Sequence, residues 1–374
     1  MVNTISSVFW CSNCLNMSTR PRITFSANGM CNACTWSEEK KNLDWNNRTQ
    51  ELKSILSANR SIDGRHDCIV PVSGGKDGSY VAHQLKSVYG MNPLTITVNP
   101  ALALDLGNRN LDNFIASGFT NMKFNLNPRV LQKVNKVGFE KWGFPYYGWL
   151  LGIMTVPVRL ALNLGINLIF YGEDGEIEYG GSTETKDIPH YDTDYMRKIY
   201  FESGQDVILN NSDLSMQDRY WFDFPESHEN SYSNLKILHW SYFENWDPYR
   251  NYIVAKENCG LEEAITTNDG TFTNFAQNDQ GLYALHTYMM YLKFGFGRAT
   301  QDAGIEIRRG AMDREQGLSL VRMFDGTYPE FWESQYLEYY RLTKKQFYTI
   351  LESHTNKDLF EFKDGRVKPK FEVV

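Results

Sequence analysis

The chain alternates between short apolar runs and longer stretches in which apolar residues recur every three or four positions. Short apolar runs are typical of strands buried on both faces, and the longer period is typical of helices. The runs are 68–70, 94–98, 121–125 and 167–171, and the helical patterns cover 79–89, 111–117, 129–142 and 149–164. Strands that alternate with helices predict an α/β fold built on a doubly wound parallel sheet.

Outside this core the pattern changes and divides the chain into regions. The apolar residues of 38–60 fall on one helical face, which predicts a helix that joins the N-terminal segment to the core. Aromatic residues concentrate between Tyr191 and Tyr252, where they either pack in the interior or stack on a sugar or base. We expect a four-cysteine ribbon in 1–40, the α/β core in 41–180, an aromatic-rich insert and substrate cleft in 181–260, and a helical region with basic residues in 261–374.

The composition argues against some classes of function. The 374 residues carry a net charge of −7 and a pI near 5.6, which disfavours a general nucleic-acid binder. The longest apolar stretch, Trp149 to Leu162, contains Pro157 and Arg159 and is shorter than the roughly 20 residues that a membrane span needs. We therefore expect a cytoplasmic protein that binds neither nucleic acid nor a membrane.

The segment from Pro71 to Ser79 predicts a nucleotide site. It follows an apolar run and opens a helix, so its backbone N–H groups would meet a ligand at the positive end of a helix dipole. It matches neither the Walker A nor the Rossmann pattern, and Gly-Gly pairs also mark ordinary turns. A carboxylate repels phosphate, so Asp77 is expected to act through Mg²⁺ or to fix the loop. The residues expected at the nucleotide are Ser73, Gly74, Gly75, Lys76, Asp77 and Ser79.

This loop resembles the PP-loop of the ATP pyrophosphatase superfamily, whose members split ATP into AMP and pyrophosphate. The resemblance implies the adenine nucleotide alpha hydrolase type of α/β fold. Loops of the superfamily commonly carry Ser directly after the Asp, whereas this chain has Gly78 followed by Ser79. The hydroxyl contact at this position is therefore the least supported part of the resemblance.

Polar residues follow two other predicted strands. Asn99 comes after the second strand, and Gly172, Glu173 and Asp174 come after the last one. Ligands of doubly wound sheets bind at the carboxyl ends of the strands, so these residues are expected around the same crevice as the loop. Glu173 and Asp174 are candidates for a general base, and a helix cap is the alternative for either of them.

Four cysteines near the N-terminus form two C-x-x-C pairs, Cys11 with Cys14 and Cys31 with Cys34. This spacing is typical of a zinc ribbon, in which four thiolates close a tetrahedral site and leave no position for substrate. A disulfide scaffold is disfavoured because the chain has only six cysteines and no signal peptide precedes them. A redox pair is disfavoured because neither C-x-x-C lies at a strand-to-helix junction. We therefore expect structural Zn²⁺.

The last third of the chain carries a cationic segment. Lys293 and Arg298 flank Phe-Gly-Phe-Gly, and Arg308, Arg309 and Arg314 follow. Arginines suit bidentate recognition of phosphate or carboxylate, and a Gly-x-Gly-Arg turn lets the backbone approach a ligand. Solvated charges on helix surfaces are an equally good interpretation of this segment.

Taken together, the motifs resemble the N-acetyl sugar amidotransferase family over essentially the whole chain. They are the four-cysteine ribbon, the 71–80 loop, Thr97 to Pro100, Tyr171 to Glu173 with Glu178 to Gly181, and Lys293 to Thr300. The resemblance implies synthesis of bacterial surface polysaccharide (lipopolysaccharide O-antigen) or flagellin glycan. It further implies that an acetamido group on a nucleotide sugar, or on a nonulosonic acid of the pseudaminic or legionaminic type, becomes an acetamidino group.

That chemistry requires ATP, because an amide oxygen is a very poor leaving group. Adenylation of the oxygen lets ammonia displace it as AMP, and cationic groups with Mg²⁺ neutralise the departing pyrophosphate. The residues expected to carry the reaction are Lys76, Asp77, Glu173, Lys293 and Arg298.

The nitrogen is expected to come from a separate protein. A glutaminase needs an activated cysteine, and neither Cys68 nor Cys259 lies in a recognisable nucleophile context. The family resemblance likewise implies a separate glutaminase subunit, resembling that of imidazole glycerol phosphate synthase, with or without a cyclase-like companion. Two other functions stay open, a tRNA-thiolating PP-loop enzyme and a non-catalytic zinc-ribbon interaction subunit.

Overall fold

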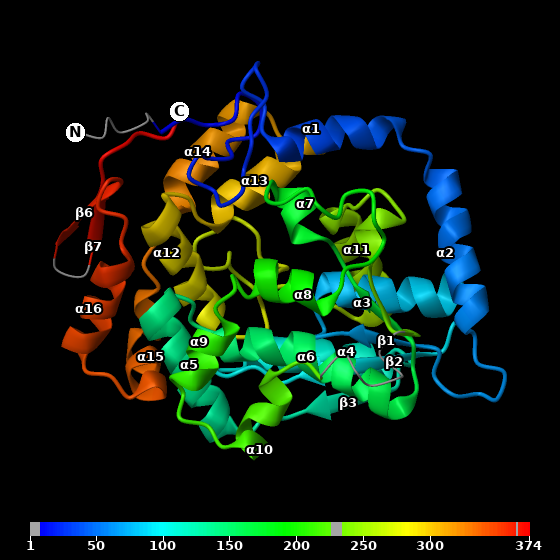
Figure 1. Cartoon of the computed structure of the whole chain (residues 1–374). Helices are drawn as coiled ribbons and strands as arrows, with labels where there is room; N and C mark the ends of the chain where they lie inside the picture. The colour runs from blue at the N-terminus through cyan, green and yellow to red at the C-terminus, as the bar shows by residue number, and fades with distance from the viewer. Residues whose placement is uncertain (1–7, 226–233, 364–365) are drawn as a thin grey trace.

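The computed structural model describes residues 8–225, 234–363 and 366–374 and is built on a five-stranded parallel sheet (Figure 1). The strand order is β3-β2-β1-β4-β5, and every neighbouring pair is parallel. The strands are β1 (Cys68–Pro71), β2 (Pro93–Val98), β3 (Asn121–Phe124), β4 (Leu168–Tyr171) and β5 (Lys236–His239). The order reverses between β1 and β4, so the carboxyl ends of these two strands flank a crevice, the usual place for a ligand in such sheets.

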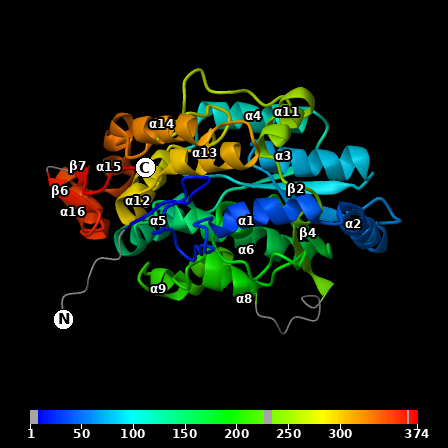
Figure 2. The same ribbon diagram turned by 90° about the horizontal axis from the view of Figure 1, so that it is seen from above.

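Helices cover both faces of the sheet, as the sequence predicts. Figure 2 shows α3 (Lys76–His83) and α4 (Asp105–Ala116) on one side, and α5 (Pro128–Trp142) and α6 (Tyr147–Leu164) on the other. Because successive strand residues point to opposite faces, Val70 packs with α3 and α4 whereas Ile69 packs with α5 and α6. The doubly wound parallel sheet is confirmed.

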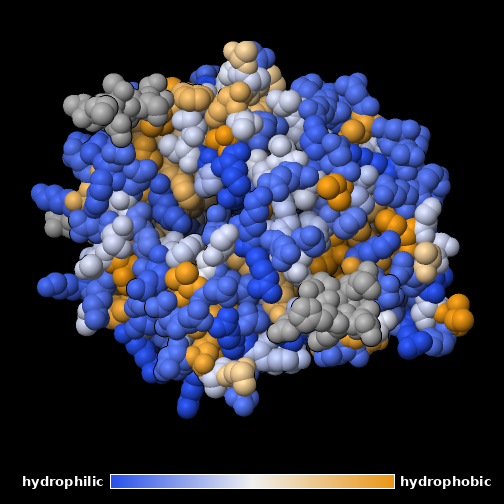
Figure 3. Space-filling model, in the orientation of Figure 1, coloured by the Kyte–Doolittle hydropathy of each residue, from blue (hydrophilic) through white to orange (hydrophobic). Residues whose placement is uncertain are grey.

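Helix α6 is the most apolar element of the core. By length and composition it could span a membrane, but 67% of its apolar window is buried inside the fold. It extends beyond the stretch from Trp149 to Leu162 that the sequence analysis identified, so the helix is longer than that stretch. Its burial marks it instead as a core helix. The face drawn in Figure 3 is mostly hydrophilic, with scattered hydrophobic residues.

Other elements depart from the sequence prediction. The predicted helix over 38–60 is divided, because α1 (Asn32–Glu39) and the 3₁₀ turn η1 (Lys40–Asn42) precede α2 (Trp45–Asn59). The predicted helix 79–89 starts earlier as α3 and continues as a π-helical turn, η2 (Gln84–Val88).

The region 181–260 contributes directly to the sheet. It supplies the edge strand β5, so the sheet extends beyond the 41–180 range expected for the core. It also supplies α11 (Pro248–Cys259), which packs closely on α3. The short helices before and around β5 are α7 (Gly175–Tyr179), α8 (Thr193–Tyr195), η3 (Met196–Tyr200), α9 (Gln205–Asn210), α10 (Met216–Arg219), η4 (Tyr220–Phe222) and η6 (Trp240–Tyr242).

The C-terminal region is helical and packs onto the same core. Leu285, Met289 and Leu292 of α12 share a buried cluster with Val134 and Phe139 of α5. Figure 1 shows α12, α15 and α16 beside α5. The elements of this region are α12 (Leu282–Phe294), α13 (Arg298–Arg308), α14 (Arg314–Phe324), η7 (Glu330–Trp332), α15 (Glu333–Tyr340), α16 (Lys344–His354) and the hairpin of β6 (Phe360–Lys363) and β7 (Arg366–Pro369).

Candidate active site and metal centre

The loop after β1 leads directly into the N-terminus of α3, and two of its three glycines are required by the packing of the chain itself. Gly74 has a φ of +84°, and a Cβ there would lie 2.4 Å from the backbone nitrogen of Leu111 in α4. A Cβ on Gly78 would lie 2.7 Å from the carbonyl oxygen of Pro71. Gly75 is different, because a Cβ there would meet only the Ser73 hydroxyl, at 3.4 Å. Gly75 therefore leaves room for a ligand, whereas Gly74 and Gly78 fix the loop.

A cavity of about 320 Å³ lies over this loop. Its other walls come from the strand end at Glu173, from Tyr179 of α7, and from the 275–301 segment of the C-terminal region. Seven of the predicted site residues line it: Ser73, Gly74, Gly75, Lys76, Asp77, Glu173 and Arg298. The structure thus brings together residues that are more than 200 positions apart in the sequence.

The carboxylate of Asp77 is held at the mouth of the crevice. Its Oδ1 accepts a hydrogen bond from Nδ2 of Asn251 at 3.0 Å, and its Oδ2 pairs with the ammonium of Lys76. Gly172 lies beside it, since a Cβ on Gly172 would be 3.4 Å from the Cβ of Asp77. Asn251 is fully buried on α11, so its hydrogen bond fixes the orientation of the carboxylate.

Glu173 follows β4 and faces the cavity. Its Oε1 accepts a hydrogen bond from the Tyr179 hydroxyl at 2.8 Å. Burial raises the pKa of Glu173, and the nearby charge of Asp77 raises it further. Asp174 instead is fully buried, and its Oδ1 caps α7 by accepting from the Glu176 N–H at 3.0 Å. Of the two alternatives left open by the sequence, the helix cap is therefore found at Asp174, whereas Glu173 lines the cavity.

Arg298 is a fixed cation at the start of α13. Its Nε donates to Oδ1 of Asp302 at 2.8 Å, one helical turn away. Burial alone would lower the pKa of Arg298, but the Asp302 carboxylate holds that pKa above its ordinary value. The guanidinium consequently stays charged in the cavity wall and can interact with an anionic ligand.

Gly172, although it lies beside Asp77, is not among the residues that line the cavity, and three further predicted residues do not reach it either. The Lys293 ammonium donates to the carbonyl oxygen of Trp142 at 2.9 Å, because Lys293 lies in the last turn of α12 and faces α5. Ser79 is 1% exposed on the buried side of α3. Asn99 donates through Nδ2 to Oδ1 of Asn125 at 2.6 Å. None of the three is among the residues that line the described cavity.

The structure adds cavity residues that the sequence analysis missed. Asp279 faces the loop, and the nearby Ser73 and Tyr283 side chains act to lower the pKa of its carboxyl group. Burial raises the pKa of Asp279 from 3.8 to about 6. Tyr146 and His286 line the same wall. They reach the cavity through the packing of α6 and α12, so no local motif marks them. The one feature of the sequence that could have indicated this part of the cavity is Asp279 itself, an acidic residue just before an apolar helical pattern.

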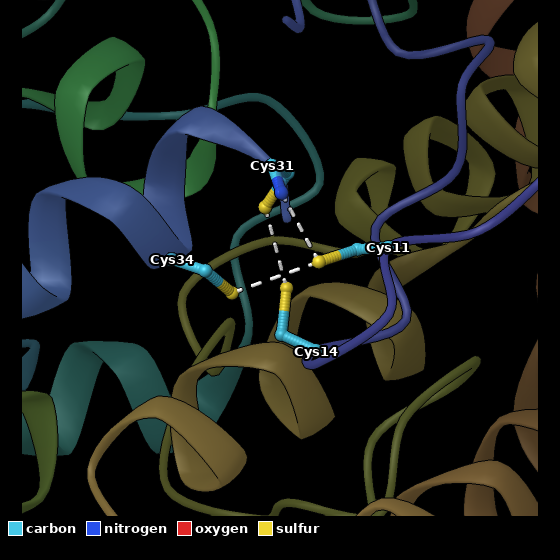
Figure 4. A group of neighbouring side chains, drawn as sticks. All are labelled: Cys11, Cys14, Cys31 and Cys34. Carbon is cyan, nitrogen blue, oxygen red and sulfur yellow. Dashed lines mark hydrogen bonds between the residues drawn. The ribbon is translucent and has the colours of Figure 1, made fainter. Parts of the chain in front are cut away.

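The four N-terminal cysteines form a compact, fully buried cluster (Figure 4). Cys11 and Cys14 come from the N-terminal loop, while Cys31 and Cys34 begin α1, and all four sulfur atoms lie within 4.8 Å of one another. Zn–S bonds of about 2.3 Å in a tetrahedron place sulfurs about 3.8 Å apart. The Cys11–Cys34 and Cys14–Cys31 sulfur distances are 3.8 and 3.5 Å. The donor set therefore fits one tetrahedrally coordinated metal ion.

Polar groups around the cluster suit thiolate ligands and connect it to the cavity. The backbone N–H of Cys31 donates to the Cys11 sulfur at 3.2 Å, and Nδ2 of Asn13 donates to the Cys34 sulfur at 3.4 Å. Asn16 donates both to the Cys31 sulfur, at 3.4 Å, and to the carbonyl oxygen of Tyr179, at 3.1 Å. Because Tyr179 also hydrogen-bonds Glu173, the metal centre helps position one wall of the cavity.

Comparison with known proteins adds a family for the C-terminal region. Residues 269–372 match the family described as LPS biosynthesis protein WbpG-like, C-terminal domain. For this part of the chain, the match confirms the predicted resemblance to proteins of lipopolysaccharide synthesis. These residues include Asp279, Tyr283, His286 and Arg298, so this domain supplies one wall of the cavity.

Similarity elsewhere is weaker. No curated protein matches the chain. Among solved structures, the U34-tRNA thiolase NcsA from Methanococcus maripaludis with its 4Fe–4S cluster is 13% identical. The alignment covers 81% of this chain and 86% of the thiolase, with a TM-score of 0.28. At that score the likeness carries no functional inference.

The metal centre gives a first prediction. Cys31→Ser removes one of the four thiolates, so the metal content should fall from one ion per chain to none. The free energy of unfolding should drop by several kilocalories, less than the about 10–16 kcal/mol of isolated zinc peptides. Elemental analysis and urea unfolding check this, with Cys259→Ala as a control because Cys259 is buried outside the cluster. Full stability in Cys31→Ser would show that no structural metal is held there.

Asp279 gives a second prediction, because its pKa is higher in the folded chain than the ordinary 3.8. The carboxyl group therefore favours folding below pH 3.8, and this contribution is lost as the pH rises through about 6. Asp279→Asn should raise the free energy of unfolding at pH 8 by up to about 3 kcal/mol, at 1.36 kcal/mol per pKa unit, and by much less at pH 4.

Urea unfolding at both pH values provides the measurement. Asp112→Asn is the matched control, because the Asp112 side chain is 67% exposed. If Asp279→Asn destabilised the chain equally at pH 4 and pH 8, the carboxyl group would matter only as a hydrogen-bond partner.

Proposed function

We propose that this chain, whose residues 269–372 match a WbpG-like lipopolysaccharide-biosynthesis domain, is an ATP-dependent amidotransferase that acts on an N-acetyl sugar. The observation that carries the proposal is the shared cavity. The PP-loop-like segment forms one wall and Arg298 of the WbpG-like domain forms another. A nucleotide and a second substrate would therefore meet between them. A nucleotide sugar or a nonulosonic acid in surface glycan synthesis would be that substrate, and because the reaction would use ATP, we expect it in the cytoplasm.

The proposed reaction has two steps. The acetamido oxygen attacks the α-phosphorus of ATP and the bond to pyrophosphate breaks, which leaves an O-adenylated imidate that keeps the amide N–H. Ammonia then adds to the imidate carbon, a base takes one proton from the added nitrogen, the C–O bond breaks, and AMP leaves with the original amide oxygen. The product is a protonated acetamidino group, which carries a positive charge at neutral pH.

Residues of the loop suit the first step. Ser73, Gly75 and the N-terminus of α3 would hold the pyrophosphate portion of ATP. Asp77 would hold Mg²⁺, which neutralises phosphate charge when bound. Lys76 and Arg298 are the cations in the cavity wall that would stabilise the charge on the leaving pyrophosphate.

Glu173 is the proposed base. Burial and the charge of Asp77 raise its pKa, which brings a carboxylate closer to the range where it can exchange a proton near neutral pH. The Tyr179 hydroxyl fixes its Oε1 and leaves the other oxygen for the substrate. Asp279, with a pKa of about 6, is a second group that could exchange a proton in the same cavity.

We assign zinc to the four-cysteine cluster, with a structural role. Four thiolates leave no open coordination position for substrate. The sulfurs are also too close together for a cubane cluster, in which each thiolate binds a different iron.

Ammonia would come from a separate glutaminase. Cys68 and Cys259 are 0% and 1% exposed, and neither lines the described cavity. Burial raises the pKa of both thiols, that of Cys259 to about 11, so neither resembles an activated nucleophile. The same observations weigh against the tRNA-thiolating alternative, which needs reactive cysteines at the site. A non-catalytic zinc-ribbon subunit is disfavoured because Gly75 leaves room for a ligand and Asp77 lines the same cavity.

Asp77→Asn should abolish the formation of AMP and pyrophosphate, because it removes the carboxylate proposed to hold Mg²⁺. Asn251 can still hydrogen-bond the amide, so the fold should persist. Pyrophosphate release with ATP, ammonium and an N-acetyl sugar gives the rate, and circular dichroism checks the fold. Asp112→Asn serves as the exposed control. Wild-type turnover in Asp77→Asn, or ADP as the product, would refute the assignment of the loop.

The nitrogen source gives a further prediction. The purified chain should form amidine with high ammonium and almost none with glutamine, and the rate should rise with pH as free NH₃ increases. Addition of a glutaminase subunit should restore glutamine use. Glutamine-dependent turnover by the chain alone, persisting after Cys68→Ala and Cys259→Ala, would show that the nitrogen is supplied in another way.

A further inference from the structure

One wall of the cavity is aromatic rather than charged. Tyr146, from the start of α6, and Tyr283, in the first turn of α12, meet edge to face with ring centroids 5.2 Å apart. His286, one turn further along α12, lies 4.9 Å from Tyr146 and 4.6 Å from Phe144 between ring centroids. We call Tyr146, Tyr283 and His286 the aromatic wall. All three line the same cavity as the loop and Arg298.

The imidazole of His286 has unused hydrogen-bonding capacity. Its Nδ1 is buried and has no hydrogen-bond partner among the described residues. Burial lowers the pKa of His286 to about 3, and the charges of Lys293 and Arg298 act in the same direction. The ring is therefore neutral near pH 7, with one nitrogen that donates and one that accepts. Leaving a buried polar atom without a hydrogen-bond partner costs free energy. A ligand or a water molecule that hydrogen-bonds this nitrogen would therefore be favoured.

The chemistry of this wall matches an acylamido group better than a phosphate. Phosphate suits the opposite side of the cavity, where the loop N–H groups and the charges of Lys76 and Arg298 lie. A secondary acetamide is neutral and planar, with one N–H donor, one carbonyl acceptor and a methyl group. A neutral imidazole can accept from the N–H, and the tyrosine rings can pack against the methyl.

We propose that the aromatic wall is the binding subsite for the acetamido group of the sugar, with His286 accepting the hydrogen bond of the amide N–H. This inference rests on the proposed function and names the part of the cavity that recognises the acyl group. In this position the amide oxygen can turn toward the loop, where the α-phosphate of ATP would lie. His286 binds and orients the substrate, and Glu173 remains the proposed base.

Two substitutions separate hydrogen bonding from packing. His286→Phe keeps an aromatic ring beside Phe144 and Tyr146 but removes both nitrogens. His286→Asn loses the ring but places an amide near the position of Nδ1, so it should restore part of the hydrogen bonding. His66→Phe is the control, because His66 does not line the cavity.

Saturation-transfer NMR with UDP-N-acetylglucosamine tests the subsite without requiring turnover. In the wild-type chain, the acetyl methyl should receive more saturation than the uridine protons. This preference should be lost in His286→Phe, partly restored in His286→Asn and unchanged in His66→Phe. Equal acetyl saturation in wild-type and His286→Phe chains, or none in the wild type, would overturn the inference.

Kinetics separate this inference from the proposed function. His286→Phe should raise the KM for the N-acetyl sugar at least tenfold, while the KM for ATP stays within about twofold. Turnover in His286→Phe with an unchanged sugar KM would overturn the subsite and leave the amidotransferase proposal standing. Acetyl saturation that depends on His286, without AMP formation from any N-acetyl sugar, would uphold the subsite and overturn the proposed reaction.

Discussion

The whole site depends on how closely the loop after β1 approaches helix α4. Residue 74 can have no side chain, because a Cβ there would lie 2.4 Å from the backbone nitrogen of Leu111. This contact holds the loop against α4 and aims the N-terminus of α3 into the crevice between β1 and β4. The positions of Asp77, on the first turn of α3, and of Ser73 follow from it. The C-terminal domain then closes the cavity over the loop.

The metal centre and the cavity belong to one connected structure. The cysteine cluster fixes Asn16, Asn16 holds the end of α7, and Tyr179 at that end hydrogen-bonds Glu173. Arg308 of α13 adds a second connection, since it donates to the carbonyl oxygen of Glu178 at 3.2 Å. Hydrogen bonds therefore link the ribbon to both sides of the cavity. This arrangement couples the cysteine cluster to the position of the cavity walls.

The sequence allowed prediction of those features that are encoded locally. The doubly wound sheet follows from alternating apolar patterns, and the loop and the C-x-x-C pairs follow from residue type and spacing. The edge strand β5 was missed because its four residues lie among aromatic residues that mask the pattern of a strand. Lys293 and Arg298 looked alike in the sequence. The helix phase of α12 turns Lys293 toward Trp142, whereas Arg298 begins the next helix at the cavity.

The tertiary contacts of the cavity could not be predicted in this way. Asp279 and His286 carry no motif, and they meet the loop only because α12 packs beside α5 and α6. Their shifted pKa values arise from burial, which is a property of the folded chain. Asn251 likewise reaches Asp77 only because α11 packs on α3. Each of these contacts joins segments far apart in the sequence, where residue pattern carries no information.

The central claim is that the acetamido oxygen of the substrate is transferred to AMP. The most direct measurement uses an N-acetyl sugar labelled with ¹⁸O in the acetamido group, together with ATP and ammonium. Mass spectrometry of the products then locates the label. The account predicts ¹⁸O in the phosphate of AMP, unlabelled pyrophosphate and an amidine product without the label. Unlabelled AMP with ¹⁸O retained in the sugar would contradict it.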